Sequence, residues 1–142
     1  MEHHAGEAGA LRRAGLGASR PRRWILSYLR SRRDHPTADQ IYSALLPHMP
    51  TLSKMTVYNT LRAFIERGIC RDVRIERDIV RYDPCLEDHG HFKCGVCATV
   101  HDVPMPEAAF HSDMLEGFEI KQRDVFFMGV CPDCVRRLEK ST

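Results

Sequence analysis

Two pairs of cysteines have a spacing that suits a metal ion. Cys94 and Cys97 form one C-x2-C pair, and Cys131 and Cys134 form a second, with 33 residues between the pairs. Four thiolates in two such pairs are typical ligands of a tetrahedral structural zinc site. A single C-x2-C pair is also typical of a redox dithiol, but a second pair of the same spacing favours zinc.

Nitrogen and oxygen donors flank the first cysteine pair. If the chain turns midway between those two cysteines, an antiparallel hairpin over 89–103 pairs His89 with Asp102 and places His91 on the same face. The two thiols then point to the opposite face, and the neighbouring His101 also points away. Two imidazoles and a carboxylate suit ferrous iron or manganese, and also zinc. The alternative interpretation is a pair of surface histidines beside an acid.

The elements that must position these groups fall into two halves. In the first half, residues 1–17 are Gly/Ala-rich and predict a flexible tail. Helices are predicted from Ser19 to about residue 33, from Thr37 to Pro47 and from Ser53 to Gly68, each beginning at a capping residue. Two charged strands, 69–76 and 79–83, follow. Three short helices and a basic hairpin describe a winged helix-turn-helix.

The third helix has an apolar stripe and an opposite polar face. Val57, Leu61, Phe64 and Ile65 recur at helical spacing, and Asn59 lies almost opposite them. Residues 11–84 carry a net charge of +8, whereas residues 85–142 carry −4. A basic half of this kind favours a polyanionic partner, here the DNA duplex. The expected DNA-binding residues on this helix and on the following strands are Thr56, Tyr58, Asn59, Arg62, Arg74 and Arg77.

The second half predicts a small unit of mixed structure. The hairpin over 89–103 is followed by an amphipathic helix over 106–116, by a strand pair or one long strand over 118–130, and by a short helix from about Pro132. A unit of this size is expected to need a structural metal or a partner subunit. The predicted fold class is therefore α+β, with an N-terminal winged helix-turn-helix domain and a small C-terminal α/β dimerisation domain. The predicted boundaries are 1–17 for the tail, 18–84 for the winged helix, 85–91 for a hinge with metal ligands, and 92–142 for the dimerisation domain.

The composition excludes several protein classes. The chain has 142 residues, of which 43% are hydrophobic and 28% are charged, as is typical of globular proteins. No apolar run approaches the roughly 18 residues needed to cross a bilayer, and the N-terminus does not read as a signal peptide. We therefore expect a cytoplasmic protein with no membrane contact, whose thiols are free or metal-bound. Cys70 and Cys85 lack a partner of the right spacing and are interpreted as small, partly buried residues.

Four motifs resemble the ferric uptake regulator (Fur) family. They are His35-Pro-Thr-Ala-Asp39, Thr56-Val-Tyr-Asn-Thr-Leu61, Arg81-Tyr-Asp83 and His89-Gly-His-Phe-Lys-Cys-Gly-Val-Cys97, in the order of that family. The resemblance covers about residue 19 to Cys134. It implies a homodimeric repressor that binds a double-stranded DNA operator and is not an enzyme, with a structural Zn²⁺ and a regulatory Fe²⁺ or Mn²⁺ at the domain junction. Carried over motif by motif, the regulatory ligands are His35, Asp83, His89, His91 and Asp102.

Within the family, the chain most resembles the peroxide-sensing branch. Asn59 stands where the iron-uptake branch usually has arginine, and Asp102 stands where that branch usually has glutamate. Asp88 and Gly90 interrupt the histidine-rich run that supplies a further metal site in many iron-uptake and zinc-uptake members. This branch implies that hydrogen peroxide is the signal and that His35 and His89 are the oxidation targets.

Two other functions remain open. One is a repressor of the same family that responds to iron or another metal without peroxide sensing. The remote one is a redox enzyme that uses a C-x2-C pair, which would leave the DNA-binding half unexplained.

Overall fold

The computed structural model describes residues 5–32 and 34–142, which divide into two compact units. The division falls between Leu86 and Glu87, inside the segment predicted to be a hinge. Residues 1–4 of the predicted tail and Arg33, at the end of the first predicted helix, lie outside the described residues. No helix in the described part of the chain is both long enough and apolar enough to cross a membrane.

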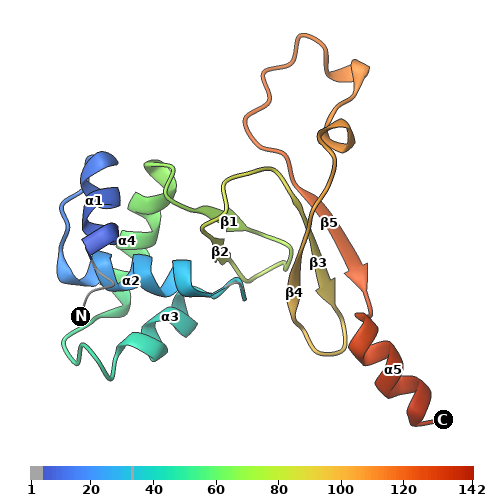
Figure 1. Ribbon diagram of the computed structural model, residues 1–142, viewed down its shortest axis with the longest axis horizontal. Helices are drawn as coiled ribbons and strands as arrows, with labels where there is room; N and C mark the ends of the chain where they lie inside the picture. Colours follow the sequence, from blue (N-terminus) through green and yellow to red (C-terminus); the bar gives the residue numbers. More distant parts are fainter. Residues whose placement is uncertain (1–4, 33) are drawn as a thin grey trace. The chain divides into compact units, whose positions relative to one another are not determined.

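Three helices and a short hairpin form most of the N-terminal unit (Figure 1). The helices are α2 (Arg20–Ser31), α3 (Ala38–Leu45) and α4 (Lys54–Glu66), and the strands are β1 (Arg71–Val73) and β2 (Arg81–Asp83). The Ser19 and Ser53 hydroxyls cap α2 and α4 by accepting backbone N–H bonds, and Thr37 forms a reciprocal capping box with Gln40. The three predicted helices and their capping residues are therefore confirmed.

The core of this unit lies between the helices. The apolar residues that are fully buried there include Ile25, Leu29, Ile41 and Leu61. In α4, Val57 and Phe64 are buried with Leu61 as predicted, but Ile65 is 37% exposed and lies at the edge of the stripe. Gly68 ends the helix with a φ of +67°, a conformation that glycine adopts readily.

The prediction of a flexible tail is wrong for the residues that form a further helix, α1 (Ala5–Arg13). Leu11 is fully buried and belongs to the same core cluster as α2 and α4. The Arg67 guanidinium, just past α4, also donates to the Ala14 carbonyl at 3.3 Å. A single well-placed leucine thus docks this Gly/Ala-rich segment, although the segment lacks a repeating apolar stripe.

The basic hairpin is shorter than the predicted strands. β1 and β2 pair antiparallel over three residues, from Arg71 opposite Asp83 to Val73 opposite Arg81. Residues 74–80 lie between these strands without joining the ladder. In this segment, the Ile75 side chain is buried and the Glu76 carboxylate accepts from the Arg81 guanidinium, so side-chain contacts replace the strand pairing that was predicted.

The C-terminal unit contains a three-stranded sheet and a terminal helix (Figure 1). Strand β3 (Gly90–Cys94) lies in the middle, with β4 (Val100–Val103) antiparallel on one side and β5 (Val125–Gly129) parallel on the other. Helix α5 (Pro132–Lys140) follows directly, which confirms the predicted last helix.

The register of the β3–β4 hairpin differs from the prediction by two residues. His91, and not His89, is opposite Asp102, and Phe92 is opposite His101. The reason is a wider turn, which is closed by hydrogen bonds from Cys94 N to Thr99 O and from Ala98 N to Cys94 O. A shift of two residues preserves which side chains share a face.

The segment between β4 and β5 is less regular than predicted. Two short 3₁₀ helices, η2 (Glu107–Phe110) and η3 (Asp113–Leu115), replace the expected helix over 106–116, and β5 is the only strand within 118–130. The Ser112 hydroxyl caps η3 and so interrupts a continuous helix. Met114 of the predicted apolar stripe is 84% exposed, so among the described residues no packed surface supports a longer helix.

Candidate metal centres and DNA-binding face

The four cysteines of the two C-x2-C pairs gather in the C-terminal unit. Cys94 ends β3, Cys97 lies in the following turn, Cys131 is the N-cap of α5, and Cys134 lies in its first turn. The four sulfur atoms lie within 4.8 Å of one another, and the Cys97 and Cys131 sulfurs are 3.9 Å apart. Zinc–sulfur bonds of about 2.3 Å in a tetrahedron place sulfurs about 3.8 Å apart, so these thiols fit Zn²⁺.

Backbone N–H groups prepare this site for a cation. The amides of Val96, Cys97 and Cys131 donate to the Cys94 sulfur at 3.4, 3.5 and 3.3 Å. These bonds, with that from Cys131 the strongest, lower the pKa of the Cys94 thiol to about 6. A hydrogen bond with the Thr99 hydroxyl lowers the pKa of Cys97, whereas desolvation raises the pKa of Cys134 to about 12. The turn after β3 and the N-terminus of α5 therefore stabilise the thiolate form of Cys94, at the β3 end of the site.

A set of nitrogen and oxygen donors lies in the same unit. The Nε2 atoms of His89 and His91 lie 3.0 and 3.5 Å from one carboxylate oxygen of Asp102, and the two imidazole rings are 4.5 Å apart. The Nδ1 atom of His89 is 2.6 Å from the Glu87 carbonyl oxygen, which leaves Nε2 available to a metal. Ligands about 3 Å apart are expected when bonds of about 2.1 Å meet at right angles on one ion.

A second pair of donors lies in the N-terminal unit. His35 Nε2 is 3.5 Å from one oxygen of Asp83, whose other oxygen accepts from the backbone N–H of Cys85 at 2.8 Å. The loop that carries His35 is joined to β2 by a bond from Tyr82 N to the Pro36 carbonyl and by a bridge between Thr37 and Arg81. His35 itself has a φ of +52°, which is unusual for a residue other than glycine.

The chemistry of these donors suits a different metal from the thiol site. Imidazole and carboxylate groups suit Fe²⁺ and Mn²⁺, and also Zn²⁺, whereas four thiolates favour Zn²⁺. The cysteine set thus fits a structural zinc ion, and the histidine and aspartate groups fit a regulatory metal. His101 pairs with Phe92 and lies on the face away from Asp102, as predicted.

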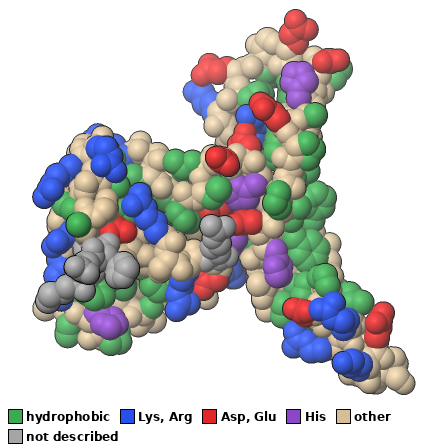
Figure 2. Space-filling model, in the orientation of Figure 1, with side chains coloured by type: hydrophobic (Ala, Val, Ile, Leu, Met, Phe, Trp, Pro, Cys, Tyr) green, Lys and Arg blue, Asp and Glu red, His purple; other side chains and the backbone are tan. Residues whose placement is uncertain are grey.

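The outer face of α4 carries the polar groups expected to meet DNA. Asn59 and Arg62 are exposed, and Tyr58 is 46% exposed with its hydroxyl donating to Asp39 at 3.4 Å. The Thr56 hydroxyl forms a hydrogen bond with the capping hydroxyl of Ser53 at 2.9 Å. Thr56 therefore stabilises the start of α4 and also lies on this face. The surface of the N-terminal unit displays many Lys and Arg side chains (Figure 2).

The arginines of the hairpin differ in their contacts. Arg74 is exposed and donates to Asp72 at 2.7 Å, which offsets part of its charge. Arg77 is also exposed and lies at the tip of the segment between β1 and β2. Both side chains are accessible to a phosphate, and Arg74 must share its charge with Asp72.

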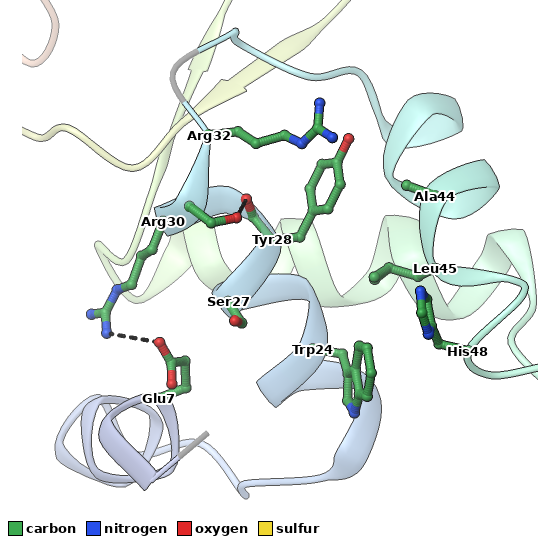
Figure 3. A pocket seen from close by; sticks show the side chains of 10 residues that line it. Glu7, Trp24, Ser27, Tyr28, Arg30, Arg32, Ala44, Leu45 and His48 are labelled. Carbon is green, nitrogen blue, oxygen red and sulfur yellow. Dashed lines mark hydrogen bonds and ion pairs between the residues drawn. The ribbon is translucent and has the colours of Figure 1, made fainter. Parts of the chain in front are cut away.

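A pocket of about 720 Å³ lies among α1, α2 and α3 (Figure 3). Trp24 stacks on His48 with their rings 5.2 Å apart, and Arg30 faces Glu7 at 4.0 Å. The residues that line it include neither thiols nor any of the metal-ligand candidates, so it does not extend the metal chemistry.

Sequence reasoning missed the contacts that orient the ligands and one feature of the unpaired cysteines. The Glu87 carbonyl contacts the His89 ring, and the Arg81 guanidinium contacts the His35 carbonyl. Motif spacing reveals neither contact. Cys70 is buried as expected, and desolvation raises its pKa to about 12, but Cys85 is exposed and not partly buried.

Known proteins resemble the chain along most of its length. The sequence pattern of the Ferric uptake regulator family matches residues 13–128. A peroxide-responsive repressor PerR from Staphylococcus aureus is 34% identical over 138 residues, which are 94% of this chain and 93% of that protein. The iron-containing ferric uptake regulator of Francisella tularensis has a TM-score of 0.71 and 25% identity, over 85% of this chain and 96% of that one. PerR from Streptococcus pyogenes has a TM-score of 0.53 and 28% identity over 94% of each chain. This chain therefore belongs to the ferric uptake regulator family, as a metal-responsive repressor.

Proposed function

We propose that this repressor senses hydrogen peroxide through a regulatory Fe²⁺ ion and releases its operator when ligand histidines are oxidised. The observation that carries the proposal is the convergence of His89 and His91 Nε2 on one oxygen of Asp102, a short carboxylate in the ligand position. The relatives named peroxide-responsive repressors, at 34% identity over nearly the whole chain, support the same function.

The regulatory ion takes ligands from both units in this proposal. His35 and Asp83 would supply one part of its shell, and His89, His91 and Asp102 the other. Each part has ligand atoms at separations that one ion can accommodate. A metal shared in this way favours one arrangement of the two units, and DNA binding follows if that arrangement is the one that fits the operator.

DNA binding requires two copies of the chain in this proposal. Two recognition helices, here α4 of each copy, reach successive major grooves, with Asn59 toward base edges and Arg77 toward phosphates. The C-terminal unit offers an apolar surface for the second copy, because Phe126, Phe127 and Met128 of the edge strand β5 are 39, 43 and 72% exposed. Exposed apolar strands at a sheet edge are typical of pairing surfaces.

The chain's own residues determine where oxidation occurs. A ferrous ion held by these residues would supply the electrons that activate hydrogen peroxide. In the proposed site, His35 and His89 would present their imidazole rings to this ion and would be the groups that are oxidised. Each oxidation adds one oxygen atom from peroxide to an imidazole carbon and releases the other oxygen as water. The modified ring would be a weaker ligand, so metal affinity and with it operator affinity would fall.

The alternative is a repressor of the same family that loses and regains metal without oxidation. Operator binding by the iron-loaded protein separates the two functions. After a brief exposure to peroxide and removal of the excess, we expect operator binding to stay lost when fresh Fe²⁺ or Mn²⁺ is added. Full recovery on adding metal would identify a metal sensor without peroxide chemistry. The manganese-loaded protein, treated in parallel, is the control for damage unrelated to iron.

A further inference from the structure

Arg81, at the start of β2, contacts two parts of the N-terminal unit at once. Its Nε atom donates to the carboxylate of Glu76, which lies between β1 and β2. Its Nη1 atom donates to the backbone carbonyl of His35 at 3.1 Å. We call residues 74–80 the wing loop. One guanidinium therefore joins the wing loop to the loop that carries a proposed metal ligand.

The loop around His35 depends on this attachment. His35 adopts a left-handed backbone with a φ of +52°, and such a conformation persists only where neighbouring contacts hold it. The contacts are the Arg81 bond to His35 O, the Tyr82 N–H bond to Pro36 O at 3.0 Å, and the bridge between Thr37 and Arg81. Because the backbone fixes the direction of the His35 side chain, Arg81 helps to position its Nε2 beside Asp83.

The wing loop is closed by the same side chain. Glu76 and Arg81 are five residues apart, and their ion pair holds together the two ends of the segment that carries Arg77 and Asp78. Arg77 is the wing residue expected to contact phosphate. A shift of Glu76 therefore changes where the guanidinium of Arg77 is presented.

We propose that Arg81 is a positioning residue that couples metal binding at His35 to the DNA-binding conformation of the wing loop. The inference rests on the proposed function, because it takes His35 as a ligand of the regulatory ion. A guanidinium has donors in a fixed planar fork, so movement of one acceptor is transmitted to the other. By linkage, DNA that engages the wing loop must raise metal affinity by the factor by which metal raises DNA affinity.

The test compares the Mn²⁺ affinity of the full chain with and without DNA. The probe is a duplex that the manganese-loaded wild type selects from random DNA. The ratio of the two Mn²⁺ dissociation constants measures the coupling, which in allosteric proteins is about 5- to 150-fold. We expect Glu76→Ala and Arg81→Lys to bring the ratio to within about twofold of one. Lysine retains the charge but has no fork with which to contact both partners.

Asp72→Ala is the matched control. It removes another ion pair of the same hairpin, with Arg74, which among the described residues has no bond to the His35 loop. We expect it to keep the wild-type ratio. A second measurement needs no metal, namely the hydrogen-exchange rate of the Tyr82 amide, which reports its bond to Pro36. Exchange should accelerate about tenfold or more in Arg81→Lys and stay unchanged in Asp72→Ala.

The outcomes separate this inference from the proposed function. A wild-type ratio above one that persists in both variants overturns the role of Arg81 and leaves the repressor function intact. A wild-type ratio of one overturns both, because metal then does not promote DNA binding. If Glu76→Ala fails to fold, Arg81→Lys alone decides, and an unchanged ratio in that variant contradicts the proposal.

Discussion

The thiol set and the imidazole–carboxylate set differ in how much of the chain is needed to build them. All four cysteines lie within one unit, between the end of β3 and the first turn of α5, with backbone amides already directed at the Cys94 sulfur. The other donors lie partly in the N-terminal unit, as His35 and Asp83, and partly in the C-terminal unit, as His89, His91 and Asp102. The thiol set is thus preorganised within one unit, whereas the imidazole–carboxylate set is distributed over two units.

This difference suits two different tasks. A site whose ligands come from one compact unit adds the binding free energy of its metal to the stability of that unit. A distributed set, if one ion completes it, makes the arrangement of two units depend on metal occupancy. The zinc site is then expected to be insensitive to the signal, whereas the regulatory site responds to it.

Loss of a zinc ligand should have the largest effect. Cys97→Ser leaves three thiolates, and because structural zinc binding contributes about 10–16 kcal/mol in small domains, we expect loss of bound zinc and of cooperative unfolding of the C-terminal unit. Zinc content and thermal unfolding are the measurements. Cys85→Ser, at an exposed cysteine outside the cluster, is the matched control and should leave both unchanged. A zinc-free variant with the same stability as the wild type would show that zinc has no structural role.

Changes at Asp102 should affect the response and spare the fold. In the proposed site, the shorter aspartate would hold the ion closer to the hairpin and favour coordination through one oxygen, which would leave room for peroxide. We therefore expect Asp102→Glu to keep metal-dependent operator binding but to slow release by peroxide roughly tenfold or more, the scale of other changes around metal sites. Asp102→Ala should weaken both, because it removes a ligand. Equal peroxide rates in wild type and Asp102→Glu would show that the carboxylate length has no role.

Changes on the DNA-binding face should have smaller effects. Asn59→Ala is expected to reduce discrimination of operator from random DNA by about 1–3 kcal/mol, as for a good side-chain contact to a base. Arg77→Ala should weaken binding to both duplexes and lower the slope of its salt dependence by about one. Competition binding at several salt concentrations distinguishes the effects of the two substitutions. Equal losses on both duplexes for Asn59→Ala would place this side chain away from the bases.

The sequence predicted those elements whose signals are local. Ser19, Thr37 and Ser53 mark helix starts by side-chain capping, which needs no distant partner, and all three are found. The cysteine spacing likewise predicted a cluster that the fold assembles. The hairpin over 89–103 followed from the pattern, but its exact register did not, because the register depends on how the turn wraps around the Cys94 sulfur. The sheet order, with β5 parallel to β3, was not predicted.

Elements that depend on tertiary contacts were missed. Helix α1 is held by the burial of Leu11 and by the bond from Arg67, neither of which leaves a repeating pattern. The expected helix over 106–116 had such a pattern but lacks a packed surface in the described unit, and Met114 remains exposed. The candidate ligand residues came from motifs, whereas the groups that contact them, Arg81 and the Glu87 carbonyl, required the structure.

The distributed set is tested most directly by peptide mass mapping after a brief exposure to peroxide. The iron-loaded protein should gain the mass of one oxygen atom on the peptide that contains His35 or on the one that contains His89, in step with loss of operator binding. The manganese-loaded protein should not gain it, and the peptides with the four zinc-site cysteines should stay unmodified in both. If neither histidine peptide gains oxygen and operator binding returns with fresh metal, the chain is a metal sensor and the peroxide function is contradicted.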